Sequence, residues 1–208
     1  HNIVIVGGGT AGWLAANHLG CALAKQADIF SITLIESPDI PPIGVGEGTV
    51  PNIKKSLKKF GISETEFIQE CDVSFKQSIR FVNWMDKTKH GEDNFFHHLF
   101  DIPTSADADE LTEHWIHNHL NKNNKSFAET MSSQHNVCEQ GKAPKKITTA
   151  EYDEELAYAY HLNAGKFAQL LARNATEKFS VNHVMANVSE VTLTHDGAIK
   201  SLVTDSEG

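Results

Sequence analysis

The feature that most restricts what this chain can fold into is a glycine-rich turn that directly follows a short apolar run. The run is Ile3-Val-Ile-Val6, and Gly7, Gly9 and Gly12 follow it in the G-x-G-x-x-G spacing. Four successive β-branched residues predict a strand that is buried on both faces. The glycines allow, in turn, a tight turn, a close backbone approach to a pyrophosphate and packing of the next helix on the strand. This combination predicts a dinucleotide-binding βαβ unit.

A second apolar run strengthens the dinucleotide interpretation. A helix is predicted from Thr10 to about Gln26, because its apolar residues recur at helical spacing. The run Ser31-Ile-Thr-Leu-Ile-Glu36 then predicts a second strand that ends in an acid. Glu36 follows Gly12 at close to the spacing of about 20 residues that is typical of a ribose-binding carboxylate. The alternative is an α/β domain whose glycine turn binds nothing.

Composition limits the classes of partner. The chain has 208 residues, 40% of them hydrophobic, and a formal net charge of −9. Such acidity argues against nucleic acid or an anionic membrane as the main partner. Because no apolar run could span a bilayer and the first residues already form a strand, we expect a soluble, cytoplasmic protein without a signal peptide. A zinc site at His114, His117 and His119 is disfavoured, since the segment lacks cysteine or HExxH companions, and we expect no metal.

The predicted fold class is α/β, a Rossmann-like core with an inserted region. Residues 1–84 would form the βαβ core, a proline- and glycine-rich loop and a further strand. The polar, histidine-rich residues 85–150 would form an irregular or helical insertion. Residues 151–208 would return to the core through a helix, capped by Asn163, and a β-hairpin that turns at His195-Asp-Gly197. Because no strand follows this hairpin, we expect the chain to be the N-terminal part of a longer one.

Two lysine-bearing segments are predicted to expose their charges. Residues 74–84 alternate between apolar and polar side chains, which predicts one strand with Lys76 on its polar face. From the pattern alone, such a lysine is typical of a solvent-facing position. Four further lysines follow Pro51 and predict the solvated face of a short helix. These are Lys54, Lys55, Lys58 and Lys59.

Five segments, in order along the chain, resemble the flavin-dependent tryptophan halogenases. They are Gly7–Trp13, Gly44–Pro51, Phe75–Trp84, Phe96–Phe100 and Tyr160–Ala164. The lysine-bearing strand that ends in Asn83-Trp84 is far more specific than the glycine turn. One departure is Gly48, which replaces the alanine of the family's Gly-Glu-Ala-Thr and leaves the stiffness of that loop open. The resemblance implies that the Trp-x-Trp-x-Ile-Pro signature and the catalytic glutamate of the family follow Gly208.

The resemblance implies FAD as the cofactor of the glycine turn. The pyrophosphate would lie against the turn, the adenosine ribose against Glu36 and the adenine beside Val188. The loop from Ile40 to Thr49 would be a strap between flavin and substrate. The implied cofactor-binding residues are Gly7, Gly9, Thr10, Ala11, Gly12, Glu36, Val45, Gly46, Glu47, Thr49 and Val188.

The resemblance also implies a reaction, FADH2-dependent halogenation of tryptophan or a related indole. A separate flavin reductase would supply reduced FAD, which would capture O2 as a hydroperoxide that chloride or bromide attacks. The resulting hypohalous acid would reach Lys76, whose ammonium can polarise the oxygen–halogen bond or whose amine can form a haloamine. His98 and Phe100 would sandwich the indole ring, while His97 has no assigned role.

Two other functions remain open at this stage. A flavin-dependent monooxygenase or NAD(P)H-using oxidoreductase could share the same first half without needing Lys76. A non-catalytic flavin-binding module is the third reading. A homodimer is an assembly that the resemblance suggests and that no residue pattern tests.

Overall fold

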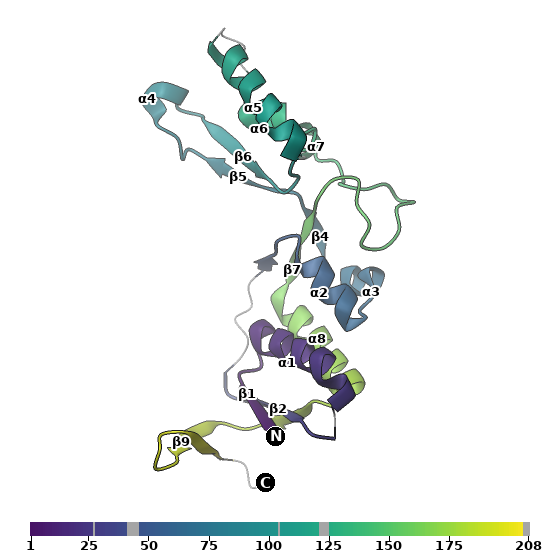
Figure 1. Ribbon diagram of the computed structural model, residues 1–208, viewed down its shortest axis with the longest axis vertical. Coiled ribbons are helices and arrows are strands. Elements are labelled where there is room, and N and C mark those ends of the chain that lie inside the picture. Colours follow the sequence, from purple (N-terminus) through teal and green to yellow (C-terminus); the bar gives the residue numbers. More distant parts are fainter. Residues whose placement is uncertain (27, 41–45, 104, 121–124, 206–208) are drawn as a thin grey trace. The chain divides into compact units, whose positions relative to one another are not determined.

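In the computed structural model the predicted glycine turn joins the first strand, which belongs to a parallel sheet, to the first helix. The structure describes residues 1–26, 28–40, 46–103, 105–120 and 125–205. The chain forms two compact units, each described by itself below (Figure 1). The first comprises His1–Glu47, Lys55–Val73 and Leu162–Gly208, and the second comprises Gly48–Lys54 and Ser74–His161. None of the helices in the described part of the chain is both long and apolar enough to cross a membrane.

The sheet of the first unit has three parallel strands in the order β1-β2-β8. These are β1 (Asn2–Val6), β2 (Ser31–Glu36) and β8 (Asn182–Met185). The crossover between β1 and β2 is α1 (Thr10–Leu23), which continues into the 3-10 turn η1 (Ala24–Gln26). The predicted βαβ unit is therefore confirmed, with the second strand at the bounds that the sequence predicted.

The first strand is less buried than its β-branched residues predict. Val4 is 47% exposed and Val6 is 59% exposed. Helix α1 covers the other face, where the Ile5 Cγ2 atom would lie 3.6 Å from a Cβ added to Gly12. The prediction of burial on both faces is wrong for this strand within the described residues, because the face that carries Val4 and Val6 is not covered by another element.

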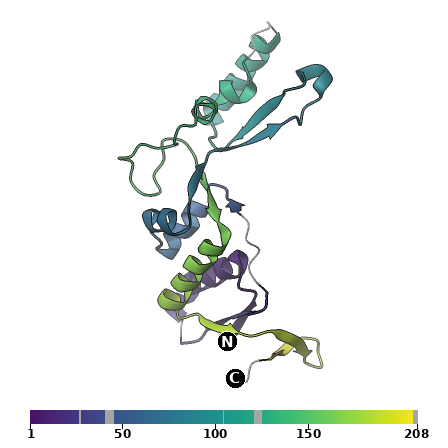
Figure 2. The same cartoon turned by 180° about the vertical axis from the view of Figure 1, so that it is seen from behind.

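Helices α1 and α8 enclose the core of the first unit and lie side by side (Figures 1 and 2). Helix α8 (Ala164–Phe179) begins at Asn163, whose side chain accepts a hydrogen bond from the Lys166 N–H at 3.1 Å. Its predicted apolar stripe of Phe167, Leu170 and Leu171 is buried. The remaining elements are α2 (Ile53–Phe60), α3 (Glu64–Glu70) and the antiparallel hairpin β9 (Val188–Leu193) and β10 (Ile199–Thr204).

Asn17 of α1 is the polar link between the two helices. Its side chain is fully buried and donates to the Trp13 carbonyl at 2.8 Å and to the Leu171 carbonyl at 2.9 Å. Its oxygen accepts a hydrogen bond from the Asn174 side chain at 2.7 Å. Because all of these partners are buried or partly buried, the bonds fix how α1 registers against α8.

The second unit consists of short strands and helices. They are β4 (Ser74–Lys76), β5 (Ser78–Val82), α4 (Lys87–His90), β6 (Phe95–Leu99), α5 (Ser105–Leu120), α6 (Phe127–Met131), α7 (Gln134–Glu139) and β7 (Ala159–Asn163). The last strand also pairs with β3 (Gly46–Gly48), in the sheet order β3-β7-β4. Both β7 and β3 continue into the first unit.

The single strand predicted over residues 74–84 is instead two strands in different sheets. β4 pairs with β7, whereas β5 pairs with β6, and the change of partner falls at Gln77. The Gln77 side-chain amide donates to the Lys142 carbonyl at 2.7 Å, and the Gln77 backbone carbonyl accepts from the Phe100 N–H at 3.1 Å. These partners hold the break in place, and they lie too far along the chain for an alternating pattern to reveal them.

One lysine of the predicted solvated face is buried. Lys54 is only 8% exposed; its ammonium pairs with Glu154 and lies 3.8 Å from the centre of the Tyr158 ring. Burial is tolerated because a carboxylate and an aromatic face replace water around the charge. The prediction was wrong at this position because both partners are about 100 residues further along the chain.

Replacement of Asn17 by alanine should lower the free energy of unfolding by about 2 kcal/mol, because the Leu171 carbonyl and the Asn174 amide lose a buried partner. Urea denaturation of the two proteins measures the difference. The exposed Asn52 provides the control, since Asn52→Ala should change stability by less than about 0.5 kcal/mol. Equal effects of the two substitutions would contradict a role for Asn17 in joining the helices.

Candidate functional site

The glycine turn after β1 is built so that larger residues would not fit. Gly7 has a φ of +121°, and its N–H donates to the Ile35 carbonyl at 2.8 Å. A Cβ added to Gly12 would lie 1.9 Å from the Gly7 carbonyl oxygen. Helix α1 therefore approaches the turn at backbone contact distance, which only glycine at position 12 permits, while the positive φ favours glycine at position 7.

The N-terminus of α1 has free space in front of it. Gly9 is the N-cap residue in an extended conformation and, without a side chain, provides no capping hydrogen bond. A Cβ added to Gly9 would meet no atom within 4 Å. The N–H groups of the first turn, which includes Thr10 and Ala11, therefore suit an anion. These residues fit the pyrophosphate of a dinucleotide such as FAD.

Glu36 ends β2 beside this turn. Its carboxyl group occupies the position where a side chain on Gly8 would be, because a Cβ added there would lie 2.0 Å from the Glu36 Cδ atom. The Glu36 Oε2 atom lies 2.9 Å from Nε2 of His183 on β8. The sequence predicted that Glu36 ends a strand, but it did not predict β8. The only apolar residues of β8 are Val184 and Met185, which are too few to indicate a strand.

Among the strap residues that the structure describes, Glu47 contacts α1 and Gly46 contacts β7. The Thr10 hydroxyl donates to Glu47 Oε1 at 3.1 Å, and Gly46 lies against the backbone of Leu162. Val45 lies outside the described residues. Val188 begins β9, while the neighbouring Ala186 N–H donates to the Glu36 carbonyl at 2.9 Å.

Lys76 is the final residue of β4 and is anchored to the backbone of the strap. Its ammonium donates to the Thr49 carbonyl at 3.1 Å. Thr49 is itself fixed, because its N–H donates to the Tyr160 carbonyl at 2.9 Å and its hydroxyl accepts from the Tyr160 N–H at 3.0 Å. The Lys76 side chain is half-buried, so this lysine is not the freely solvated one that the pattern alone indicated.

His161 lies beside Lys76, a contact that the sequence did not predict. A Cβ added to Gly48 would lie 3.2 Å from Lys76 Nζ and 3.3 Å from His161 Nδ1, so both nitrogens approach the same glycine. Burial and, secondly, the positive charge of Lys76 lower the pKa of His161 below its ordinary value. The imidazole is thus neutral at neutral pH. Its segment, Tyr160–Ala164, was part of the resemblance, but no role was assigned to the histidine.

A cavity of about 420 Å³ opens beside Lys76 in the second unit. Its volume falls within the range of small-molecule sites. The residues that line it come from three separate parts of the chain. They are Phe75, Lys76, Gln77, Ser78, Cys138, Gly141, Lys142, Ala143 and His161.

Of the two predicted substrate residues, Phe100 lies close to Lys76. The Lys76 ammonium is 5.4 Å from the centre of the Phe100 ring, and the Phe100 N–H also bonds to Gln134 at 2.9 Å. His98 lies on the exposed side of β6. The adjacent His97 is buried between Ser78, at 2.7 Å, and Glu139, at 2.8 Å. The hydrogen bond to His97 lowers the pKa of the Glu139 carboxyl group below its ordinary value.

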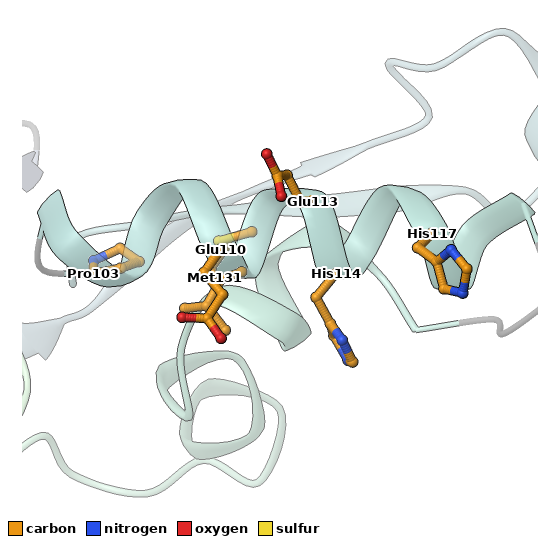
Figure 3. A pocket seen from close by; sticks show the side chains of 7 residues that line it. Pro103, Glu110, Glu113, His114, His117 and Met131 are labelled. Carbon is orange, nitrogen blue, oxygen red and sulfur yellow. The ribbon is translucent and has the colours of Figure 1, made fainter.

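A second hollow lies along α5 (Figure 3). Its polar residues include Glu113 and His114, which Figure 3 shows pointing to opposite sides of the helix. His114 bonds to Asn118 at 2.7 Å. The described residues contain no cluster of three histidine, cysteine or acidic side chains that could hold a metal. The side chain of His119 lies outside the described residues.

The closeness of Lys76 and His161 can be measured without any assay of activity. Lys76→Met should raise the pKa of His161, because it removes one of the two causes that lower it. NMR titration of the imidazole carbon-bound protons reports this pKa. Lys142→Met is the matched control, since Lys142 lines the same cavity but does not contribute to the lowered pKa. An unchanged His161 pKa in Lys76→Met would show that the two side chains are not neighbours.

Comparison with known proteins identifies relatives along the whole chain. A model of the tryptophan halogenase family matches residues 2–208. Tryptophan 7-halogenase RebH of Lentzea aerocolonigenes is 35% identical over 97% of this chain, and tryptophan 6-halogenase ThaL of Streptomyces albogriseolus is 34% identical over 98% of it. In both cases this chain covers 39% of the relative.

Solved structures agree with the sequence matches. The crystal structure of tryptophan halogenase from Shewanella frigidimarina is 40% identical with a TM-score of 0.87, over 100% of this chain and 40% of that one. Tar14, a tryptophan C-6 flavin-dependent halogenase (chlorinase) from taromycin biosynthesis, is 29% identical with a TM-score of 0.84 and the same coverage. The chain thus spans about two fifths of the length of these relatives. On this match of sequence and fold, the chain belongs to the tryptophan halogenase family.

Proposed function

We propose that this protein is an FAD-dependent halogenase that acts on tryptophan or a related indole, with Lys76 as the catalytic residue. The observation that carries the proposal is the short segment Glu47-Gly48-Thr49. At one end Glu47 bonds to Thr10 beside the glycine turn, and at the other the Thr49 carbonyl anchors the Lys76 ammonium. Within the first unit Glu47 therefore contacts the expected cofactor turn, and within the second unit Thr49, two residues later in the chain, contacts the expected catalytic amine.

The cofactor would be held by the residues already assigned to it. The first-turn N–H groups of α1 would bind the pyrophosphate, Glu36 would accept hydrogen bonds from the ribose and Val188 would pack beside the adenine. Bound reduced FAD supplies the electrons with which O2 and chloride or bromide become hypohalous acid. In this arrangement residues 1–84 provide the FAD-binding core, the strap and the lysine strand, residues 85–150 provide the substrate side, and residues 151–208 return to the FAD-binding domain.

Lys76 would hold the hypohalous acid and make its halogen electrophilic. An ammonium has three N–H donors, and the Thr49 carbonyl occupies one, which leaves two for the oxygen of the acid. As the indole carbon attacks, the carbon–halogen bond forms and the oxygen–halogen bond breaks, and the oxygen takes a proton from the Lys76 ammonium and leaves as water. The ring then loses its own proton, which restores the ammonium, and regains aromaticity. The same nitrogen, once deprotonated, could alternatively carry the halogen as a haloamine.

The indole would lie beside Lys76, against Phe100 and His98, neither of which is among the residues that line the cavity described above. Phe100 lies on the Lys76 side and offers an aromatic face, while His98 would complete the sandwich. Such positioning matters because the halogen must meet one ring carbon and not its neighbours. A separate flavin reductase would supply the reduced cofactor, and the assembly would be a homodimer.

The test uses the whole protein with FAD, a flavin reductase, NADH, O2, tryptophan and bromide or chloride. We expect a product whose mass spectrum carries the isotope pattern of the halogen. Lys76→Ala should lower its rate of formation by about 100-fold or more, because the group that polarises the oxygen–halogen bond is lost. The exposed Lys55 gives the matched control, and Lys55→Ala should halogenate at the normal rate.

Two outcomes would contradict the proposal in different ways. Normal halogenation by Lys76→Ala would remove the lysine from the mechanism. A hydroxylated product that forms without halide would instead identify a monooxygenase.

A further inference from the structure

We propose that His183 is a positioning residue of the nucleotide site, which holds the Glu36 carboxylate in place for the adenosine ribose. This inference rests on the proposed use of FAD and adds a residue to that site. It concerns the first unit alone, and all of the contacts that carry it lie between described residues.

The sheet brings the two side chains to one side. β8 runs parallel to β2, and Leu34 is the register partner of His183. Because side chains alternate along a strand, Glu36 points to the same face as Leu34 and lies diagonally beside His183. The Nε2 atom of His183 lies 2.9 Å from Oε2 of Glu36. The backbone supports this contact, since the Ala186 N–H bonds to the Glu36 carbonyl at 2.9 Å.

The imidazole is itself held from a second direction. Trp13, which is 1% exposed in α1, meets the His183 ring edge-to-face at 4.8 Å between ring centres. The His183 and Glu36 side chains are 30% and 25% exposed. A hydrogen bond between partly buried groups, one of them packed on a tryptophan, restricts the rotamers of both.

The restriction matters because Glu36 lies directly over the glycine turn. It fills the space where a Gly8 side chain would be, so its carboxyl group is confined between Gly8 and His183. A carboxylate has two oxygens, and His183 occupies Oε2. The other oxygen remains for a ribose hydroxyl. Without His183 the carboxylate would be less restricted, and the nucleotide would have to order it on binding, which lowers the affinity.

The experiment compares ligands that contain or lack the adenosine half. Dissociation constants of FAD, ADP and FMN are measured by fluorescence or calorimetry on the protein and on His183→Leu. We expect His183→Leu to raise the dissociation constants of FAD and ADP by about tenfold and to leave that of FMN unchanged, since FMN has no adenosine ribose. His183→Gln should restore most of the affinity, because its amide nitrogen can donate to Glu36 from nearly the same place.

A double-mutant cycle tests whether His183 acts through Glu36. In the Glu36→Gln background, His183→Leu should cost less than twofold in FAD affinity. His195→Ala is the matched control, since His195 is exposed in the hairpin turn, and it should bind all three ligands normally.

Three results would overturn the inference. An equal loss of FMN and FAD affinity would indicate that His183 only stabilises the fold. Unchanged FAD and ADP affinity in His183→Leu would overturn the role of His183 while leaving the proposed function intact. Failure of the unsubstituted protein to bind FAD would overturn both.

Discussion

The proposed catalytic site depends on the hydrogen bond from the Lys76 ammonium to the Thr49 carbonyl, 3.1 Å long. A half-buried ammonium needs a fixed acceptor, and this one is a backbone atom. Thr49 cannot easily move, because three hydrogen bonds join it to Tyr160 on the strand that also pairs with the Lys76 strand. The position of a long, flexible side chain is therefore set by strand pairing. Gly48 contributes by leaving room for both Lys76 and His161.

The nucleotide site follows the same principle of fixing polar groups through the backbone. Gly7 provides the positive φ of the turn, and Gly12 brings α1 against it at a distance that no larger residue allows. The anion would then meet N–H groups whose direction the helix determines. Glu36 would be the exception, because in the proposed site its side chain would reach the ribose. The neighbouring strand supplies His183 to limit its motion, which is why a residue far along the chain belongs to the site.

Local signals predicted those parts of the structure that local interactions determine. The strand Ser31–Glu36 and the cap at Asn163 were correct, since their patterns lie within a few residues. The break at Gln77 was missed, and so was the burial of Lys54, because in each case the partner lies 65 or 100 residues away. For the same reason His161 and His183 could not be assigned from sequence. Each gains its significance from a strand neighbour.

The most direct measurement is a crystal structure of the whole protein with FAD and tryptophan bound. The account predicts the Lys76 ammonium at about 3 Å from the Thr49 carbonyl, facing the indole, with the flavin ring on the other side of the strap. It also predicts Phe100 against the indole. An ammonium that points into bulk water, away from both Thr49 and the indole, would contradict the central claim.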